Sequence, residues 1–154
     1  MVLLKSRLIA SLIDDQNETA NLYKGSCLCG SVNYVVRGEF GASAFCHCSR
    51  CRKASGSAFA SNVSVKKSEF EFTSGHETLR RFSTPAGVHR TFCSNCGSPL
   101  ISQRDSSPDV VRLRLGTLDS PGKTPEAHIF VGSKADWYEI TDTLLQFEGF
   151  PVAP

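Results

Sequence analysis

The distribution of cysteine limits more than any other feature how this chain can fold. There are seven cysteines in three short groups: Cys27 and Cys29; Cys46, Cys48 and Cys51; Cys93 and Cys96. An odd number fits a complete set of disulfides poorly, and separations of two or three positions are typical of metal ligands. We therefore expect thiolates that hold zinc. The expected location is a reducing cytoplasm, and a disulfide framework is the alternative.

The seven thiols indicate one site of four ligands and one of three, because zinc prefers four ligands. Cys29 and Cys96 are each followed by glycine, which can adopt positive φ and let backbone N–H groups turn towards the sulfurs. Cys51 is followed by Arg52 instead. These neighbours predict a closed structural site of Cys27, Cys29, Cys93 and Cys96. The alternative mixes cysteines of the central group with one outer pair.

Cys46, Cys48 and Cys51 then form the second zinc site, with a fourth position free for water or substrate. Three protein ligands and one free position are typical of catalytic zinc. His47 lies between two of these ligands, and in an extended segment it would point away from them. We expect His47 to make a local hydrogen bond or core contact; zinc ligation and proton transfer are the alternatives. His76, His89 and His128 have no spacing that implies a site.

The residues on both sides of Cys51 are basic, and a flexible turn follows them. Arg50, Arg52 and Lys53 either compensate the charge of the thiolates or grip a carboxylate on the substrate. The turn "SGS" that follows offers backbone donors. The candidate substrate contacts are Arg52, Lys53, Ser55 and Gly56.

The remaining pattern predicts a mainly β fold. Alternating or β-branched runs separated by turn residues are typical of antiparallel sheets, and they occur at 31–37, 59–65, 70–73, 79–82, 88–92, 100–103, 110–115 and 128–131. In the run at 110–115, Arg112 and Arg114 alternate with apolar residues and are expected to form a solvated face. Single helical turns are expected at 49–55, before Gly56, and at 134–140.

The chain is expected to hold one domain, at 23–151, after an N-terminal extension at 1–22. The extension has leucines at a helix-like period, and an organelle-targeting role is the alternative to simple packing on the domain. No run is apolar for the roughly 18–20 residues needed to cross a bilayer. The formal net charge of +2 gives no sign of nucleic-acid binding.

Three segments together carry a resemblance to a known family: "GSCLCGSVNY", "FCHCSRCRKASGSAF" and "RTFCSNCGSPL". They resemble the glutathione-dependent formaldehyde-activating enzyme family, to which centromere protein V also belongs. The closing segment "HIFVGSKADWYEITDTLLQFEGFP" is similar as well. The likeness covers roughly Tyr23 to Pro151.

The resemblance implies an Mss4-like fold of several small antiparallel sheets stapled by two zinc ions. The structural ion would lie on Cys27, Cys29, Cys93 and Cys96, and the catalytic ion on Cys46, Cys48 and Cys51. It also implies a carbon–sulfur lyase, with S-(hydroxymethyl)glutathione synthase as the named activity. The partners would be a thiol such as glutathione and an aldehyde such as formaldehyde, with a homo-oligomer possible and neither membrane nor nucleic acid expected.

The residues by themselves suit the same chemistry. An open three-thiolate zinc can bind a substrate thiol as thiolate or polarise an aldehyde oxygen. Thiolate delivery is favoured, because three anionic sulfurs weaken the Lewis acidity of the metal. Two other classes stay open: a non-catalytic zinc module that binds a partner or nucleic acid, and a redox sensor that uses the thiolates of the open site.

Overall fold

The computed structural model describes residues 21–119 and 122–151, and these form a mainly β molecule with one short α-helix. Most of the expected extension at 1–22 lies outside the described residues, so the division at residue 23 stays a prediction. Within the described residues, no helix is long and apolar enough to span a membrane.

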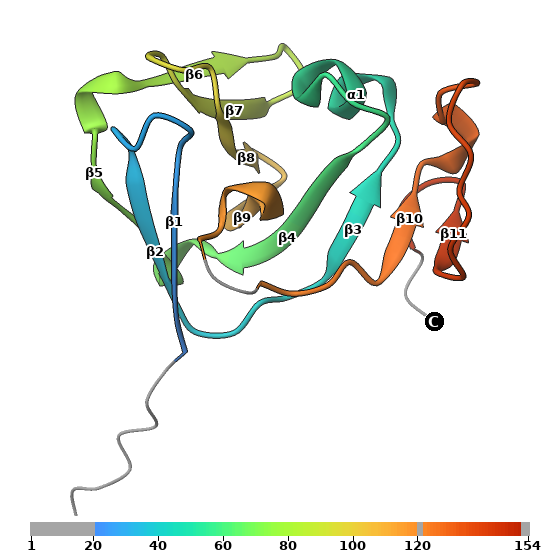
Figure 1. Ribbon diagram of the computed structural model, residues 1–154, viewed down its shortest axis with the longest axis horizontal. Helices are drawn as coiled ribbons and strands as arrows, with labels where there is room; N and C mark the ends of the chain where they lie inside the picture. Colours follow the sequence, from blue (N-terminus) through green and yellow to red (C-terminus); the bar gives the residue numbers. More distant parts are fainter. Residues whose placement is uncertain (1–20, 120–121, 152–154) are drawn as a thin grey trace, which may run out of the picture.

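Three strands form a small antiparallel sheet in the order β1–β2–β5. The bounds are β1 (Leu22–Ser26), β2 (Asn33–Arg37) and β5 (Phe70–Ser74). This sheet lies on one side of the molecule in Figure 1, where β1 and β2 are blue. Tyr34 and Val36 of β2 are almost fully buried and belong to the main core.

Eight strands form the second sheet, in the order β11–β10–β3–β4–β9–β8–β7–β6. Their bounds are β3 (Ser43–Cys46), β4 (Ala60–Lys66), β6 (Leu79–Ser83), β7 (Val88–Cys93), β8 (Pro99–Arg104), β9 (Ser107–Arg114), β10 (Ala127–Ile129) and β11 (Leu145–Phe147). Strand β10 runs parallel to both β3 and β11, and the other pairs are antiparallel. Strands β10 and β11 lie at the side of the molecule away from β1 and β2 (Figure 1).

The mainly β class is confirmed, and the described strands form one small antiparallel sheet and one larger mixed sheet. Most strands join one large sheet. This sheet is mixed because β10, after a long connection, pairs in parallel with the edge of β3. The expected strand at 128–131 ends early, at Ile129. Phe130 has φ 59, in the left-handed region, which ends the extended backbone.

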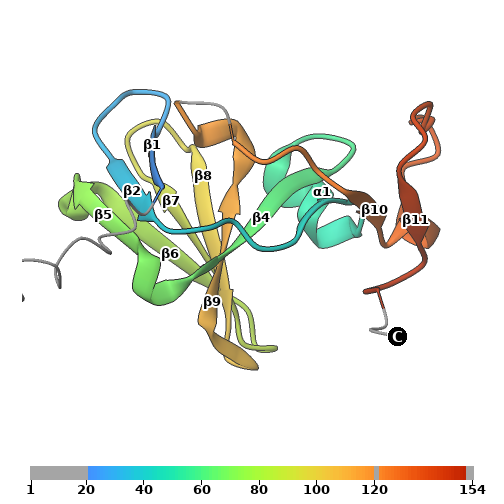
Figure 2. The same cartoon turned by 90° about the horizontal axis from the view of Figure 1, so that it is seen from below.

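The helix α1 (Ser49–Ser55) follows directly on the central cysteines, and its bounds match the turn expected before Gly56. The sulfur of Cys48 caps its first turn by accepting a hydrogen bond from the backbone N–H of Cys51. Gly56 ends it with φ 60, a left-handed conformation that glycine adopts without strain. Figure 2 shows α1 between β4 and the segment that carries β10.

The remaining helical segments are single turns of 3₁₀ type. They are η1 (Lys67–Glu69), η2 (His76–Thr78), η3 (Leu115–Thr117) and η4 (Val131–Ser133). The turn expected at 134–140 is not a helix: it is one hydrogen-bonded turn, in which Tyr138 N–H donates to Ala135 O. This bend places the Tyr138 ring against His47 and Phe59.

Candidate metal centres and the cavity beside them

The sulfurs of Cys27, Cys29, Cys93 and Cys96 form one cluster, and all lie within 4.8 Å of one another. Zn–S bonds of about 2.3 Å would place tetrahedral sulfur ligands about 3.8 Å apart. The Cys27–Cys29 and Cys29–Cys93 sulfur distances are 3.5 and 3.9 Å, so the donor set fits zinc.

Two glycine turns shape this cluster. Gly30 and Gly97 have φ 75 and 76, and their N–H groups donate to the carbonyls of Cys27 and Cys93. The backbone N–H of Val32 donates to the Cys27 sulfur. The hydroxyl and backbone N–H of Ser98, as hydrogen-bond partners, lower the pKa of the Cys96 thiol to about 5. The hydrogen bonds of Val32 and Ser98 favour thiolates, the form that binds metal, whereas burial raises the pKa of Cys27.

The sulfurs of Cys46, Cys48 and Cys51 form a second cluster, also within 4.8 Å of one another. Cys46 ends β3, Cys48 caps α1 and Cys51 lies in its first turn. Hydrogen bonds from Cys46 and Cys48 lower the pKa of Cys51, and the charges of Arg114 and Arg90 lower it further. In the described part of the chain, no fourth Cys, His or carboxylate ligand joins this cluster. That all these cysteines bind zinc stays a prediction.

The second cluster opens on a cavity of about 360 Å³, which we call the thiol cavity, lined in part by Cys46 and Cys51. Arg90, Arg104 and Arg112 reach it from β7, β8 and β9. Ile129, Leu145, Phe150 and Pro151 add apolar lining on the C-terminal side. The Arg104 guanidinium lies 5.0 Å from the centroid of the Phe150 ring, which ties the C-terminal segment to β8.

The solvated face expected for Arg112 and Arg114 is wrong. Arg114 is 5% exposed and donates a hydrogen bond to Asn62, while its Nε has no partner. Arg112 lies in the thiol cavity, and its Nη1 is buried without a partner. The reason is that this face of β9 lines two cavities, where Arg114 lies with residues of α1 and Arg112 with residues of the C-terminal segment. The alternation of these arginines with core residues in β9 was the one sequence feature that pointed to their position.

His47 points away from the cysteines, as its position between two of them suggested. It is fully buried, and its Nε2 lies 2.8 Å from Nδ1 of His128. Nε2 of His128 in turn lies 3.0 Å from a carboxylate oxygen of Asp142. The sequence did not predict this chain of three side chains, because 81 positions separate the two histidines.

The four candidate substrate contacts all lie on α1 or at its C-cap, but they do not line one common cavity. Lys53 lines a second cavity, while the Nε–H of Arg52 donates to the carbonyl of His47. Ser55 lines a third cavity, and Gly56 is the C-cap of α1. None of the four lines the thiol cavity. Their contact with substrate stays a prediction.

Comparisons with known proteins agree with this geometry. A family model described as glutathione-dependent formaldehyde-activating enzyme matches residues 22–133. A crystal structure of a Rhodobacter sphaeroides protein, from structural genomics, is 27% identical, with a TM-score of 0.56 over 66% of this chain and 97% of that chain. No curated protein gave a match. Because the family match spans most of the chain and includes all seven cysteines, the chain belongs to the glutathione-dependent formaldehyde-activating enzyme family.

Proposed function

We propose that this chain is a zinc-dependent carbon–sulfur lyase that makes or breaks adducts between a thiol and an aldehyde. The proposed activity is similar to that of S-(hydroxymethyl)glutathione synthase, with glutathione and formaldehyde as reactants. One observation carries the proposal: three clustered sulfurs, with no fourth ligand in the described residues, lie beside a cavity that two of these cysteines and three arginines line. Family membership supports it.

The proposal includes two zinc ions, an Mss4-like fold and a cytoplasmic location in which thiolates stay reduced. Cys27, Cys29, Cys93 and Cys96 would hold the structural ion. Cys46, Cys48 and Cys51 would hold the second ion, which when bound supplies stabilisation of a thiolate at neutral pH.

In the forward reaction, the sulfur of the thiol forms a bond to the carbonyl carbon. The π electron pair of the carbonyl moves to its oxygen, which receives the proton lost by the thiol, so the product is a hydroxymethyl thioether. The reverse reaction returns both reactants. The chain's part in this is to bring sulfur and carbon together in one orientation, which by itself accelerates such a step.

The arginines of the thiol cavity would stabilise the negative charge that develops on the carbonyl oxygen. Arg112 lines this cavity, and its Nη1 is a buried donor without a hydrogen-bond partner. A fixed cationic donor in a site with little water stabilises such charge more than solvent does. Leu145 and Phe150 add apolar surface to the same cavity.

The test is to change one cysteine of each cluster and to measure zinc content, folding and exchange of formaldehyde adducts. Wild-type protein is expected to hold two zinc ions and to catalyse exchange with some thiols. Cys48→Ala should keep one zinc and the fold but lose exchange, whereas Cys96→Ala should lose the fold, because a structural site contributes folding free energy directly.

Ser57→Ala is the matched control, since Ser57 is exposed near α1 and lines neither the thiol cavity nor a cysteine cluster. It should behave as wild type. Equal loss of folding in Cys48→Ala and Cys96→Ala would refute the division into catalytic and structural sites. Two bound zinc ions without exchange of formaldehyde adducts for any thiol would refute the proposed enzymatic activity.

A further inference from the structure

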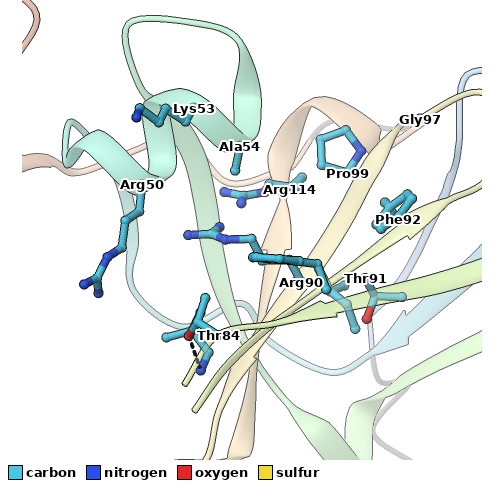
Figure 3. A pocket seen from close by; sticks show the side chains of 13 residues that line it. Arg50, Lys53, Ala54, Thr84, Arg90, Thr91, Phe92, Gly97, Pro99 and Arg114 are labelled. Atoms are coloured by element: carbon cyan, nitrogen blue, oxygen red, sulfur yellow. Dashed lines mark hydrogen bonds between the residues drawn. The ribbon is translucent and has the colours of Figure 1, made fainter. Parts of the chain in front are cut away.

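A second cavity, of about 430 Å³, lies between α1 and the strands β7, β8 and β9. We call it the helix-side cavity. Four cationic side chains line it: Arg50 and Lys53 from α1, Arg90 from β7 and Arg114 from β9. No carboxylate is among its lining residues. Figure 3 shows the guanidinium groups of Arg90 and Arg114 side by side, beneath the helix that carries Arg50 and Lys53.

This concentration of like charge is unfavourable without an anion. Burial lowers the pKa of Arg114, and the neighbouring charge of Arg90 lowers it further. Nε of Arg114 is buried without a hydrogen-bond partner. Buried cationic donors are costly unless they are paired. The Cys51 sulfur, which lines the thiol cavity, raises the pKa of Arg114 again and offsets part of this charge from that side. No carboxylate does so from the helix side.

The rest of the lining is apolar. Val88, Phe92, Pro99 and Ile101 line the cavity, and Phe82 on β6 is 59% exposed. Ligand sites of this size combine an apolar surface with a few polar groups that fix orientation. An inorganic anion would leave the apolar lining uncovered, and a neutral apolar molecule would leave the cations unpaired.

We propose that the helix-side cavity binds a carboxylate attached to an aliphatic or aromatic body. The carboxylate pairs with Arg90 and Arg114, whose planar guanidinium groups suit two parallel hydrogen bonds, and the body covers Phe92 and Ile101. Arg50 and Lys53 close the site from the helix.

The position of this site couples it to the cysteines. Arg90 lines both the helix-side cavity and the thiol cavity. The charges of Arg114 and Arg90 also act on Cys51. A carboxylate bound here therefore lies beside the second cluster, where it positions a reactant that carries an apolar group. Formaldehyde has no group that would fill such a site.

The test is calorimetric titration of the zinc-loaded full chain with 3-phenylpropionate. Binding of one equivalent is expected, with 3-phenylpropanol and inorganic phosphate each binding at least about tenfold more weakly. Arg90→Gln should weaken phenylpropionate binding by about tenfold or more, and Lys53→Gln, at an exposed position, by about two- to fivefold. Lys53→Gln keeps the test valid if Arg90→Gln fails to fold.

Arg81→Gln is the matched control, because it removes the same charge at an exposed position on β6 outside the cavity. It should leave affinity unchanged within twofold. Equal affinity for phenylpropionate and phenylpropanol would overturn the proposed carboxylate site. Equal effects of Arg81→Gln and Lys53→Gln on phenylpropionate affinity would do the same. The titration needs no turnover, so binding without exchange activity would refute only the proposed function, and exchange without binding would refute only this site.

Discussion

At the scale of single residues, Tyr34 shows how one buried polar group joins distant parts of the chain. Its ring is 1% exposed and packs against Phe70 and Phe72, and its hydroxyl lies 2.8 Å from the hydroxyl of Thr117. Burial raises the pKa of Tyr34; the Thr117 hydrogen bond lowers it in part, and the charge of Asp119 raises it further. The folded state therefore requires the neutral phenol.

This pKa shift predicts a loss of stability in alkali. A raised pKa in the folded state means that the contribution is complete below the unfolded tyrosine pKa, about 10, and falls as pH rises above it. Tyr34→Phe should cost about 1 kcal/mol of unfolding free energy at pH 8, where the hydrogen bond to Thr117 is lost. Between pH 10 and 11.5 this difference should shrink or reverse.

Urea denaturation of both proteins at each pH measures the difference directly. The comparison cancels the titration of cysteine and lysine, because both proteins share those groups. A difference that stays constant up to pH 11.5 would contradict the buried neutral phenol.

At the scale of elements, the parallel docking of β10 on β3 depends on a small number of contacts. Each strand is short, and β10 pairs with β3 at three positions. The pairing continues where His47 N–H donates to Ile129 O, and the His47 and His128 rings join the two strands in the buried interior. The histidine pair is thus a main connection between the central cysteine segment and the C-terminal part of the chain.

His128→Ala should destabilise the fold by about 3 kcal/mol, because it opens a buried cavity and leaves Nε2 of His47 without its partner. Chemical denaturation of zinc-loaded protein measures this change. His76→Ala is the matched control, since His76 is exposed in η2 and should change stability by less than about 0.5 kcal/mol. Equal stability of the two variants would show that the histidine pair does not hold β10.

At the scale of the whole molecule, the four-cysteine cluster joins the two sheets. Cys27 follows β1 of the small sheet, and Cys93 ends β7 of the large sheet. Both are buried in the main core, at 3% and 0% exposure. A metal ion at this point would link segments more than sixty positions apart, and a link of that span restricts the unfolded chain strongly.

Treatment with a strong chelator should therefore release two zinc ions in two phases. The ion on three cysteines should leave first with little change in secondary structure, because it has fewer protein ligands. The ion on four cysteines should leave later, together with the β-sheet signal. A chromogenic chelator and far-ultraviolet circular dichroism, recorded on one sample, measure both events. Loss of the β-sheet signal in the first phase would contradict the assignment of the structural ion to the four-cysteine cluster.

Much of this organisation could be predicted from local patterns. Alternation marked most strands of the large sheet, and Gly56 marked the end of α1. Cysteine spacing and the glycines at 30 and 97 divided the thiols into the two groups in which the sulfurs lie. These features are readable because each depends on residues a few positions apart, where backbone geometry alone decides which side chains share a face or a turn.

The tertiary structure decided everything that depends on residues far apart in the sequence. It buried Arg114 and half-buried Arg112, because the face of β9 that alternation marks as polar lines cavities shared with α1 and the C-terminal segment. It also paired His47 with His128 and set β10 parallel to β3. The sequence by itself determined which residues can bind metal and which can form strands. The packing of segments far apart in the sequence, which short sequence patterns do not reveal, determined which cations lie beside the three-cysteine cluster.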